Sequence, residues 1–437
     1  LSMRLKPHSA QFFPPYIHAS TITGKRSRIL KNLIFQKRKR KGQADLRYFN
    51  VCADFKKDTI DKYAILNDQY EDARVYETYG QVTVGNIFEG GRDATNLPKV
   101  DLALLEEYIA YSKMRQIDFN YSLNGSCMGN KEFTAEGAES LYTYLYDLYR
   151  AGVRKLTVAL PSVMELVLKS GLEFEIKASI ICDIQNANDA RNFKLLGANQ
   201  LVVSECISRD FKILKEIVDV FTGPVEVLVN SLCYKDCIYR TFHYNQTAHD
   251  SFRQCGNGVK TYYNHRCLLK RLEDAANVLR LGWIRPEDMQ YYEAIGIHFF
   301  KIQGRHTVVQ GDPVRAVESF FKRSYDGNLI DLLELFNSPY TFKNSLDNKK
   351  LDGFLKPFAE HPGFCKNNCD KCGYCSCFAE KHLDIAQYEE IKDAAEQFYV
   401  DFDEYNQLIA NIRQKQTDAE QCQKMNNTQE IDKFEFE

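Results

Sequence analysis

Residues 141–160 read LYTYLYDLYRAGVRKLTVAL, and this stretch contains the unit from which the fold can be predicted. Leu141, Leu145 and Leu148 recur at the spacing of one helix face, and Gly152 then marks the end of that helix. The run Lys155–Leu160 that follows is short, apolar and bounded, as a buried strand would be. A helix that ends at a glycine and leads into a buried strand is typical of α/β proteins.

The same unit recurs along the chain. Helical spacing appears again at Phe211, Leu214, Ile217 and Val218, and glycines 152, 171, 197, 223 and 296 each precede a strand-like run. The predicted strands are Tyr48–Asp54, Arg74–Tyr79, Asp118–Asn124, Lys155–Leu160, Glu175–Ile181, Gln200–Ser204, Val225–Asn230 and His298–Gln303. Eight such units predict an α/β fold with a closed (β/α)8 TIM-like barrel over about Tyr48–Arg305, with an open doubly wound sheet as the alternative. In a barrel, chemistry belongs at the carboxyl ends of the strands.

Composition and pattern suggest four parts. We predict a basic N-terminal arm at 1–44, the barrel at 45–325 with a cysteine-bearing loop at 233–267, a cysteine-rich, helix-containing extension at 326–413, and a polar tail at 414–437. Hydrophobic residues at 44% and charged residues at 27% argue against a mostly disordered chain. No apolar run reaches the ~18 residues of a membrane span, and no apolar block of a secretory signal is visible. We therefore expect a cytoplasmic protein without a membrane partner.

The charge is unevenly distributed. The net charge is −2, but residues 1–44 contain eleven Lys or Arg and no acid. A block such as Lys37–Lys41 is typical of a solvated tail, and contact with the phosphate backbone of RNA is the alternative.

A first cysteine cluster follows the seventh predicted strand. Cys233, Cys237, Cys255 and Cys267 all fall in one excursion from the functional face of the barrel. Four thiolates there could hold an iron–sulfur cluster or a tetrahedral zinc, and their spacing does not choose between them. Nearby, Arg240 and His243 could bind an anion.

A second cluster, FCKNNCDKCGYCSC, contains Cys365, Cys369, Cys372, Cys375 and Cys377. Five cysteines in thirteen residues indicate a second iron–sulfur cluster or a structural zinc, with the first four as preferred ligands. A radical S-adenosylmethionine enzyme is disfavoured, because its cysteine run should follow the first strand. The segment has few apolar residues for a core, so we expect it to need its metal in order to fold.

Three segments resemble the collagenase-like peptidase U-32 family: LVNSLCYKDCIYRTFHYN (228–245), WIRPEDMQYYEAIG (283–296) and FKIQGR (300–305). The resemblance implies an iron–sulfur barrel in which Cys233, Cys237, Cys255 and Cys267 hold a 4Fe–4S cluster. It also places Glu205 at the acidic position after strand six and Arg305 at the end of strand eight. Some members are named peptidases. Others are implicated in oxygen-independent hydroxylation of ubiquinone precursors or RNA, with prephenate as a proposed oxygen donor.

The chain departs from the family pattern before the first cluster cysteine, where Asn230-Ser231-Leu232 replaces the usual His-Gly. Gln303 replaces a glutamate, and Lys177–Ile181 replaces a His-Ala-Ser-Thr-Gln run, so we expect a divergent subgroup.

Further polar residues near the strand ends should face the barrel axis or its mouth, either as a hydrogen-bonded plug or as substrate contacts: Asn50, Glu77, Asn120, Asn124, Ser179, Glu205 and Asn230. Glu205 and Arg305 are the preferred catalytic candidates, because a carboxylate beside a cluster can move protons and a guanidinium suits a carboxylate substrate.

The sequence thus predicts an iron–sulfur enzyme performing oxygen-independent hydroxylation or related redox chemistry on a small or macromolecular substrate, with an electron donor as partner. A peptidase is the first alternative, although no HExxH motif or Ser–His–Asp order is recognisable. An RNA-binding or RNA-modifying protein is the second.

Overall fold

The computed structural model describes residues 46–92, 97–252, 262–337, 345–400, 411–412 and 414–420. The chain divides into two units, Leu1–Ala44 and Asp45–Glu437. Because the described residues begin at 46 and end at 420, the basic arm predicted at 1–44 and most of the predicted polar tail lie outside them. None of the described helices is both long enough and apolar enough to cross a bilayer.

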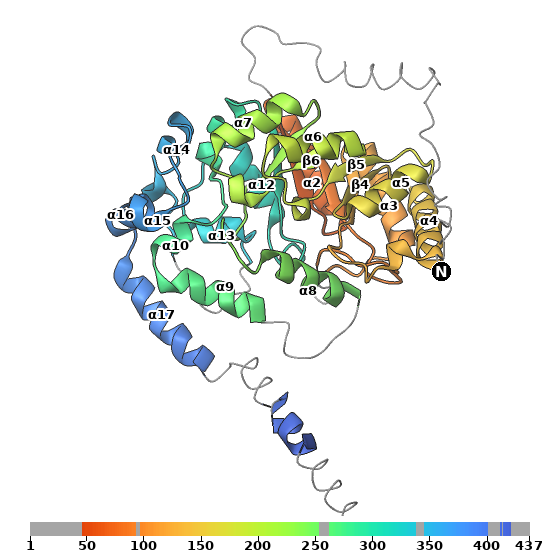
Figure 1. Cartoon of the computed structure of the whole chain (residues 1–437). Coiled ribbons are helices and arrows are strands. Elements are labelled where there is room, and N and C mark those ends of the chain that lie inside the picture. Colours follow the sequence, from red (N-terminus) through yellow and green to blue (C-terminus); the bar gives the residue numbers. More distant parts are fainter. Residues whose placement is uncertain are drawn as a thin grey trace, which may run out of the picture. The chain divides into compact units, whose positions relative to one another are not determined.

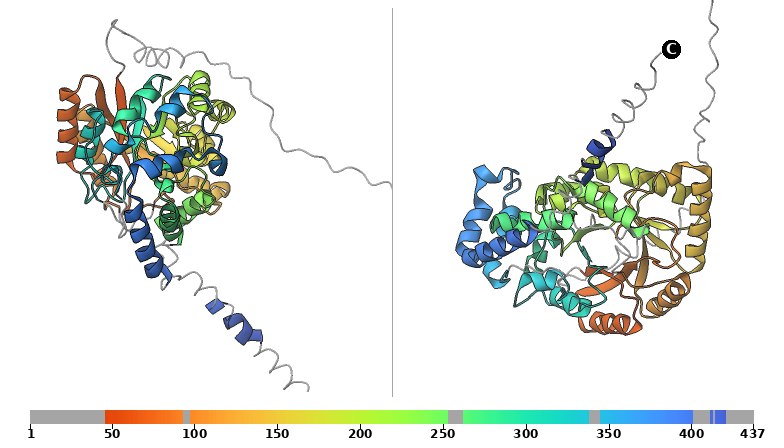
Figure 2. Two further views of the ribbon diagram at one scale, coloured as in Figure 1. Left: turned by 90° about the vertical axis from the view of Figure 1, so that its left-hand side faces the viewer. Right: turned by 90° about the horizontal axis from the view of Figure 1, so that it is seen from below.

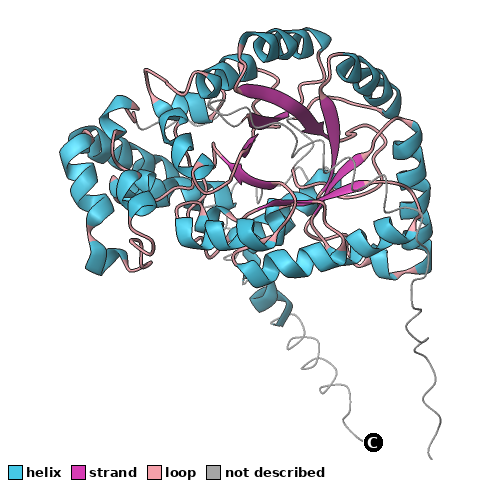
Figure 3. Ribbon diagram, turned by 90° about the horizontal axis from the view of Figure 1, so that it is seen from above, coloured by secondary structure: helices cyan, strands magenta, loops and turns pink. Residues whose placement is uncertain are grey.

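Eight parallel strands close into a barrel in sequence order, which confirms the predicted fold class and excludes the open sheet. The barrel closes because β1 pairs with β8, with Tyr48 opposite Phe299. Figure 3 shows the ring of strands with helices around it. The strands are β1 (Arg47–Cys52), β2 (Ala73–Gly80), β3 (Asp118–Leu123), β4 (Lys155–Val158), β5 (Glu175–Ala178), β6 (Gln200–Val202), β7 (Val225–Leu228) and β8 (Phe299–Ile302).

Helices lie outside the strand ring (Figure 2). Their buried apolar residues and those of the strands form one core. The first six are α2 (Lys57–Gln69), α3 (Leu102–Met114), α4 (Ala135–Arg150), α5 (Pro161–Lys169), α6 (Ala187–Leu196) and α7 (Phe211–Val220). Between β7 and β8 lie α8 (Arg240–Phe252), α9 (Tyr262–Glu273), α10 (Ala276–Leu279) and α11 (Met289–Glu293), and α12 (Pro313–Phe321) follows β8. Leu141, Leu145 and Leu148 of α4 are all buried, as their spacing predicts.

Several strands end two or three residues earlier than predicted, for a local reason. After β5, the Ser179 hydroxyl accepts a hydrogen bond from the Ile181 amide and starts a 3-10 turn. After β6, Ser204 does the same for the Cys206 amide. Serine side chains that bond the backbone compete with strand pairing, so these residues turn the chain out of the barrel.

Four of the five glycines predicted to precede strands have the left-handed backbone that ends a helix. Gly197, with φ of 105°, is the C-cap of α6. Gly223 differs, because its φ is not in that range. It is required by close approach instead, since a Cβ there would lie 2.3 Å from the Asn199 carbonyl oxygen.

The barrel interior contains buried charges rather than apolar side chains alone. The Lys177 ammonium binds Glu77 and lies 2.9 Å from Glu226 Oε2. Lys155 and Lys301 extend the network, at 3.5 Å from Glu77 and 3.8 Å from Glu226 respectively. Burial alone would raise the pKa of Glu77, but Lys177 and Lys155 hold it at about 2.

Among the predicted inward-facing residues, Asn50 and Glu77 belong to this hydrogen-bonded plug. Asn120 accepts a bond from Thr157, Asn124 binds the Gly91 amide, and Asn230 binds the backbone of Gln303 and Leu333. Their described bonds are internal, which favours the structural interpretation of these residues.

Lys301 should make the unfolding free energy depend on pH. Burial lowers its pKa to about 8, with Lys177 and Arg305 acting in the same direction and Glu226 and Glu77 opposing. An unfolded lysine keeps its proton to about pH 10.4, so between about pH 8 and 10 the unfolded chain holds a proton that the folded chain has lost. Wild-type protein should therefore gain stability relative to Lys301→Met as pH rises from 7 to 9.5. Urea unfolding of both proteins at a series of pH values measures this difference, and a constant difference would contradict it.

The C-terminal extension contains α13 (Leu329–Leu333), α14 (Lys356–Glu360), α15 (Cys369–Cys372), α16 (Tyr374–His382) and α17 (Ile385–Val400) (Figure 1). The expectation that the cysteine segment has too few apolar residues for a core is wrong. Phe354 lies 5.8 Å from Trp283 and 5.7 Å from Tyr374, measured between ring centroids. Phe358, Phe364 and Phe378 complete an aromatic cluster that joins the segment to the barrel unit. Aromatic side chains bury large areas, so a few of them are enough to form a core for this segment.

Candidate functional site

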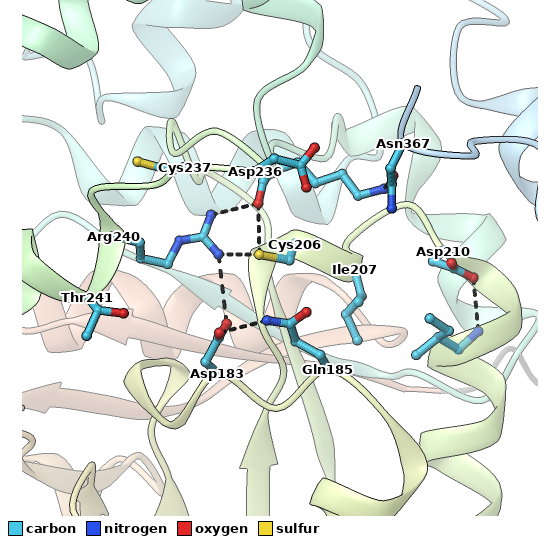
Figure 4. A pocket seen from close by; sticks show the side chains of 12 residues that line it. Asp183, Gln185, Cys206, Ile207, Asp210, Asp236, Cys237, Arg240, Thr241 and Asn367 are labelled. Atoms are coloured by element: carbon cyan, nitrogen blue, oxygen red, sulfur yellow. Dashed lines mark hydrogen bonds and ion pairs between the residues drawn. The ribbon is translucent and has the colours of Figure 1, made fainter. Parts of the chain in front are cut away.

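The carboxyl ends of β5, β6 and β7 carry loops that line a pocket of about 340 Å³ (Figure 4). Asp183 follows β5, Cys206 follows β6, and Lys235 and Cys237 follow β7. Asn367 of the C-terminal extension completes the lining. The pocket thus lies on the face where barrel enzymes place their chemistry.

Three of the four first-cluster cysteines occupy one region, and Cys255 lies outside the described residues. Burial raises the pKa of the Cys233 thiol to about 12, and the charges of Glu205 and Cys267 act in the same direction. Burial likewise raises the pKa of Cys237, and Cys267 adds to it. The charge of Cys267 raises the pKa of both Cys233 and Cys237, from which we infer that the three sulfurs are near one another.

The donor chemistry here fits an iron–sulfur cluster or zinc, because thiolates are ligands of both. Cations adjoin the thiols: Arg271 Nη2 lies 3.7 Å from Cys267 Sγ, and Arg240 acts electrostatically on Cys233. Within the described ranges, however, no three His, Cys, Asp or Glu side chains are grouped closely enough to hold a metal ion. Cys233, Cys237 and Cys267 would therefore have to move together around a cluster, joined by Cys255.

Arg240 fastens this loop to the barrel. Its guanidinium donates to the carbonyls of Tyr234 and Lys235, which lie between the first two cysteines. It also lies 2.5 Å from Cys206 Sγ and 3.9 Å from Asp183 Oδ1, as Figure 4 shows. These contacts describe a residue that positions the cysteine loop.

Glu205 is a buried carboxylate beside the cysteine loop. Its Oε1 accepts a hydrogen bond of 3.1 Å from the Tyr244 hydroxyl and lies 3.8 Å from Arg240 Nε. Its Oε2 is buried and has no hydrogen-bond partner among the described residues. A buried carboxylate oxygen without a donor is costly, so this atom is available to a substrate or a proton.

Arg305 and Arg92 give the barrel mouth a positive charge. Arg305 is 7% exposed and donates to Gln81 Oε1 at 2.6 Å. Burial and, to a lesser extent, the charge of Arg92 lower its pKa to about 10. Gly304 sets up this turn, because a Cβ there would lie 2.6 Å from Leu335 Cδ1.

His243 is stacked on Tyr263 at 5.3 Å between ring centroids. Burial and the charge of Arg92 lower its pKa to about 4. The ring is therefore neutral near pH 7, and an anion at the mouth would meet guanidinium groups rather than an imidazolium.

The charge of Arg92, a residue that the sequence interpretation missed, acts on several of the predicted site residues. Its charge influences Arg305, His243 and Cys233, and also Tyr244, the partner of Glu205. The glycine-rich run Gly90-Gly91-Arg92 after β2 was the available signal, because such loops follow strands on the functional face.

Cys365 of the C-terminal cysteine segment lies beside the same pocket, next to its lining residue Lys235. Lys235 Nζ is 3.6 Å from Cys365 Sγ and also binds Asn367. Cys365 and Cys375 are half-buried, whereas Cys369, Cys372 and Cys377 are exposed.

Comparison with known proteins gives a family. The model of peptidase family U32 matches residues 96–329, more than half of the chain. The chain belongs to peptidase family U32. An uncharacterized protease of Methanocaldococcus jannaschii is 27% identical over 295 residues, which cover 68% of this chain and 86% of that protein.

Two solved structures are more distant from this U32 chain. A structure described as a U32 peptidase is 18% identical, covers 61% of this chain and 96% of that one, and gives a TM-score of 0.43. A putative lyase/mutase from Burkholderia cenocepacia is 11% identical, covers 59% and 94%, and gives a TM-score of 0.28. Family membership therefore rests on the sequence match, and it confirms the resemblance stated above.

Proposed function

We propose that this U32 protein is an iron–sulfur enzyme that performs oxygen-independent hydroxylation or related redox chemistry on a substrate that carries a carboxylate. The observation that supports it best is the unpartnered Glu205 Oε2 next to Cys233, in a mouth whose positive charge comes from Arg92 and Arg305.

Each group would have a distinct task. Cys233, Cys237, Cys255 and Cys267 would hold the cluster, which supplies one-electron chemistry when bound. Arg305 would bind the substrate carboxylate through its guanidinium fork, since only Gln81 bonds it among the described residues. Glu205 Oε2 would accept or return a proton, while Tyr244 and Arg240 fix Oε1.

In the proposed reaction, hydroxylation without O2 takes its oxygen atom from a donor molecule. The substrate C–H bond becomes C–OH, and the donor loses that oxygen and is reduced by two electrons. The net reaction is therefore balanced without an external reductant, and an electron donor would serve only to prime the cluster.

A peptidase is the second candidate, supported by the family name and by the name of the Methanocaldococcus relative, an uncharacterized protease. Glu205 could then activate water, with Arg240 and Arg92 as nearby cations.

Metal analysis after anaerobic purification tests the first candidate. Cys233→Ser should remove about four irons per chain, because the cluster needs its thiolate ligands. Cys127→Ser is the matched control, since Cys127 is half-buried in the loop after β3, where its sulfur accepts a hydrogen bond from the Gly129 amide. Circular dichroism should show folded protein in both variants.

Full iron retention in Cys233→Ser, or a colourless wild-type protein that contains only zinc, would reject the redox proposal and favour the peptidase.

A further inference from the structure

The charges that surround the C-terminal cysteine segment point to a metal centre with a defined ligand set. We propose that Cys365, Cys369, Cys372 and Cys375 form a tetrathiolate centre, with Cys377 excluded, and that Arg209 and Lys235 of the barrel unit balance its negative charge. This centre is separate from the cluster proposed above and does not depend on it.

Helix geometry selects the ligands. Cys369 and Cys372 begin and end α15, and residues three apart lie on one helix face. Gly373, with φ of 64°, turns the chain directly into α16, where Cys375 is half-buried. Cys377 lies two residues further, roughly 200° around the helix axis from Cys375, and is exposed. One metal cannot readily reach both sides of α16.

Arg209 is the second, independent observation. It is 7% exposed, and its guanidinium lies 4.7 Å from the Trp283 ring centroid and 5.0 Å from that of Phe354. It donates to the carbonyls of Leu279 and Trp283, while its Nε has no hydrogen-bond partner in the part of the chain that the structure describes. Over the described ranges, no carboxylate forms an ion pair with it.

A buried cation without an anion is costly, so an anion is expected nearby. The groups whose negative charge raises the pKa of Arg209 are, largest first, Cys375, Tyr292, Asp288 and Cys365, and of these Asp288 is already paired with Arg285. Four thiolates around zinc or an iron–sulfur core leave a net negative charge, which would supply the missing partner.

Lys235 adds a second cation from another direction. Its ammonium lies 3.6 Å from Cys365 Sγ and is held there by Asn367 Oδ1. Arg280 helps to position the cysteine segment, because it binds Ser376 Oγ at 3.0 Å. It adds no net charge, because it is paired with Asp274. Both contacts bring barrel loops against the cysteine segment.

The sulfurs must still move, because no three described ligand-type side chains are grouped as a metal site. Cys369 and Cys372 are exposed on a four-residue helix, so they are the ligands that can close on Cys365 and Cys375.

The test is zinc, iron and sulfide analysis of the purified full-length protein and two cysteine variants. Cys369→Ser should lose one zinc, or about four irons, per chain, whereas Cys377→Ser should keep the wild-type content. Equal metal content in these two variants would overturn the ligand assignment. Cys233→Ser reports on the barrel cluster separately, so the two proposals fail independently.

Two lysine variants test whether Lys235 balances the charge of the proposed centre. Lys235→Met should weaken retention of the second metal against a chelator by about 10- to 100-fold, as loss of an outer-shell partner typically does. Lys366→Met is the control, because Lys366 is exposed and adjacent to Cys365 in sequence. Equal retention in both variants would overturn the role of Lys235.

Discussion

Replacing Lys177 by methionine is expected to lower the free energy of unfolding by about 3 to 5 kcal/mol, because it leaves buried carboxylates without their cation. Lys177 is 2% exposed and binds both Glu77 and Glu226, each of which is fully buried. Lys155 and Lys301 lie further from these carboxylates and compensate only in part. Urea unfolding followed by circular dichroism measures the change.

The control is Lys215→Met, which removes an exposed lysine paired with Asp219 one helical turn away. Such a surface pair contributes at most about 0.5 kcal/mol. If the two variants unfold at the same urea concentration, the network does not stabilise the barrel. Adding Glu77→Gln and Glu226→Gln to Lys177→Met should recover much of the loss, since the uncompensated charges are then gone.

The barrel could be predicted because its signal is local and repeated. Helix spacing, a terminating glycine and a short apolar run recur, and the closed eight-stranded ring confirms all eight strands. The strand ends could not be predicted, because they depend on whether Ser179 and Ser204 bond the backbone. Whether these hydroxyls bond the backbone depends on packing at the barrel rim.

The charged interior was only partly predictable. Glu77 was expected to face inward, but Lys177 and Glu226 were not, although each alternates with apolar residues in its strand. A charge inside a strand is recognisable as paired only when its partner on another strand is known. Glu77 and Lys177 are a hundred residues apart in the sequence.

The site shows the same limit. Cysteine spacing predicted two ligand sets and the family resemblance predicted roles for Glu205 and Arg305, and these assignments stay predictions. Arg92 was missed although the glycine-rich run before it offered a signal, and Arg209 was missed because it belongs to no motif. The burial of Arg209 could not be predicted, because it depends on contacts with the Trp283 and Phe354 rings, which lie much later in the chain.

The aromatic cluster of the extension is the basis of the other large expected effect. Phe354→Ala should lower the free energy of unfolding by about 3 to 5 kcal/mol, the usual cost of truncating a buried phenylalanine. The ring is fully buried and packs on Trp283, Phe358, Tyr374 and Phe378 at 4.9 to 5.8 Å between centroids. Limited proteolysis and urea unfolding measure the effect.

The expected proteolysis pattern follows from the contacts. Phe354 joins Trp283 of the barrel unit to Tyr374 and Phe378 of the cysteine segment, so its loss should expose residues 354–382 to protease before the strands are cut. Phe133→Ala is the control, because Phe133 is 70% exposed and should change stability by about 0.5 kcal/mol or less. Because these rings also surround Arg209, metal at Cys365–Cys375 should become more labile in Phe354→Ala. A variant that keeps wild-type stability and protease resistance would show that the segment is held to the barrel by its metal and not by its aromatic residues.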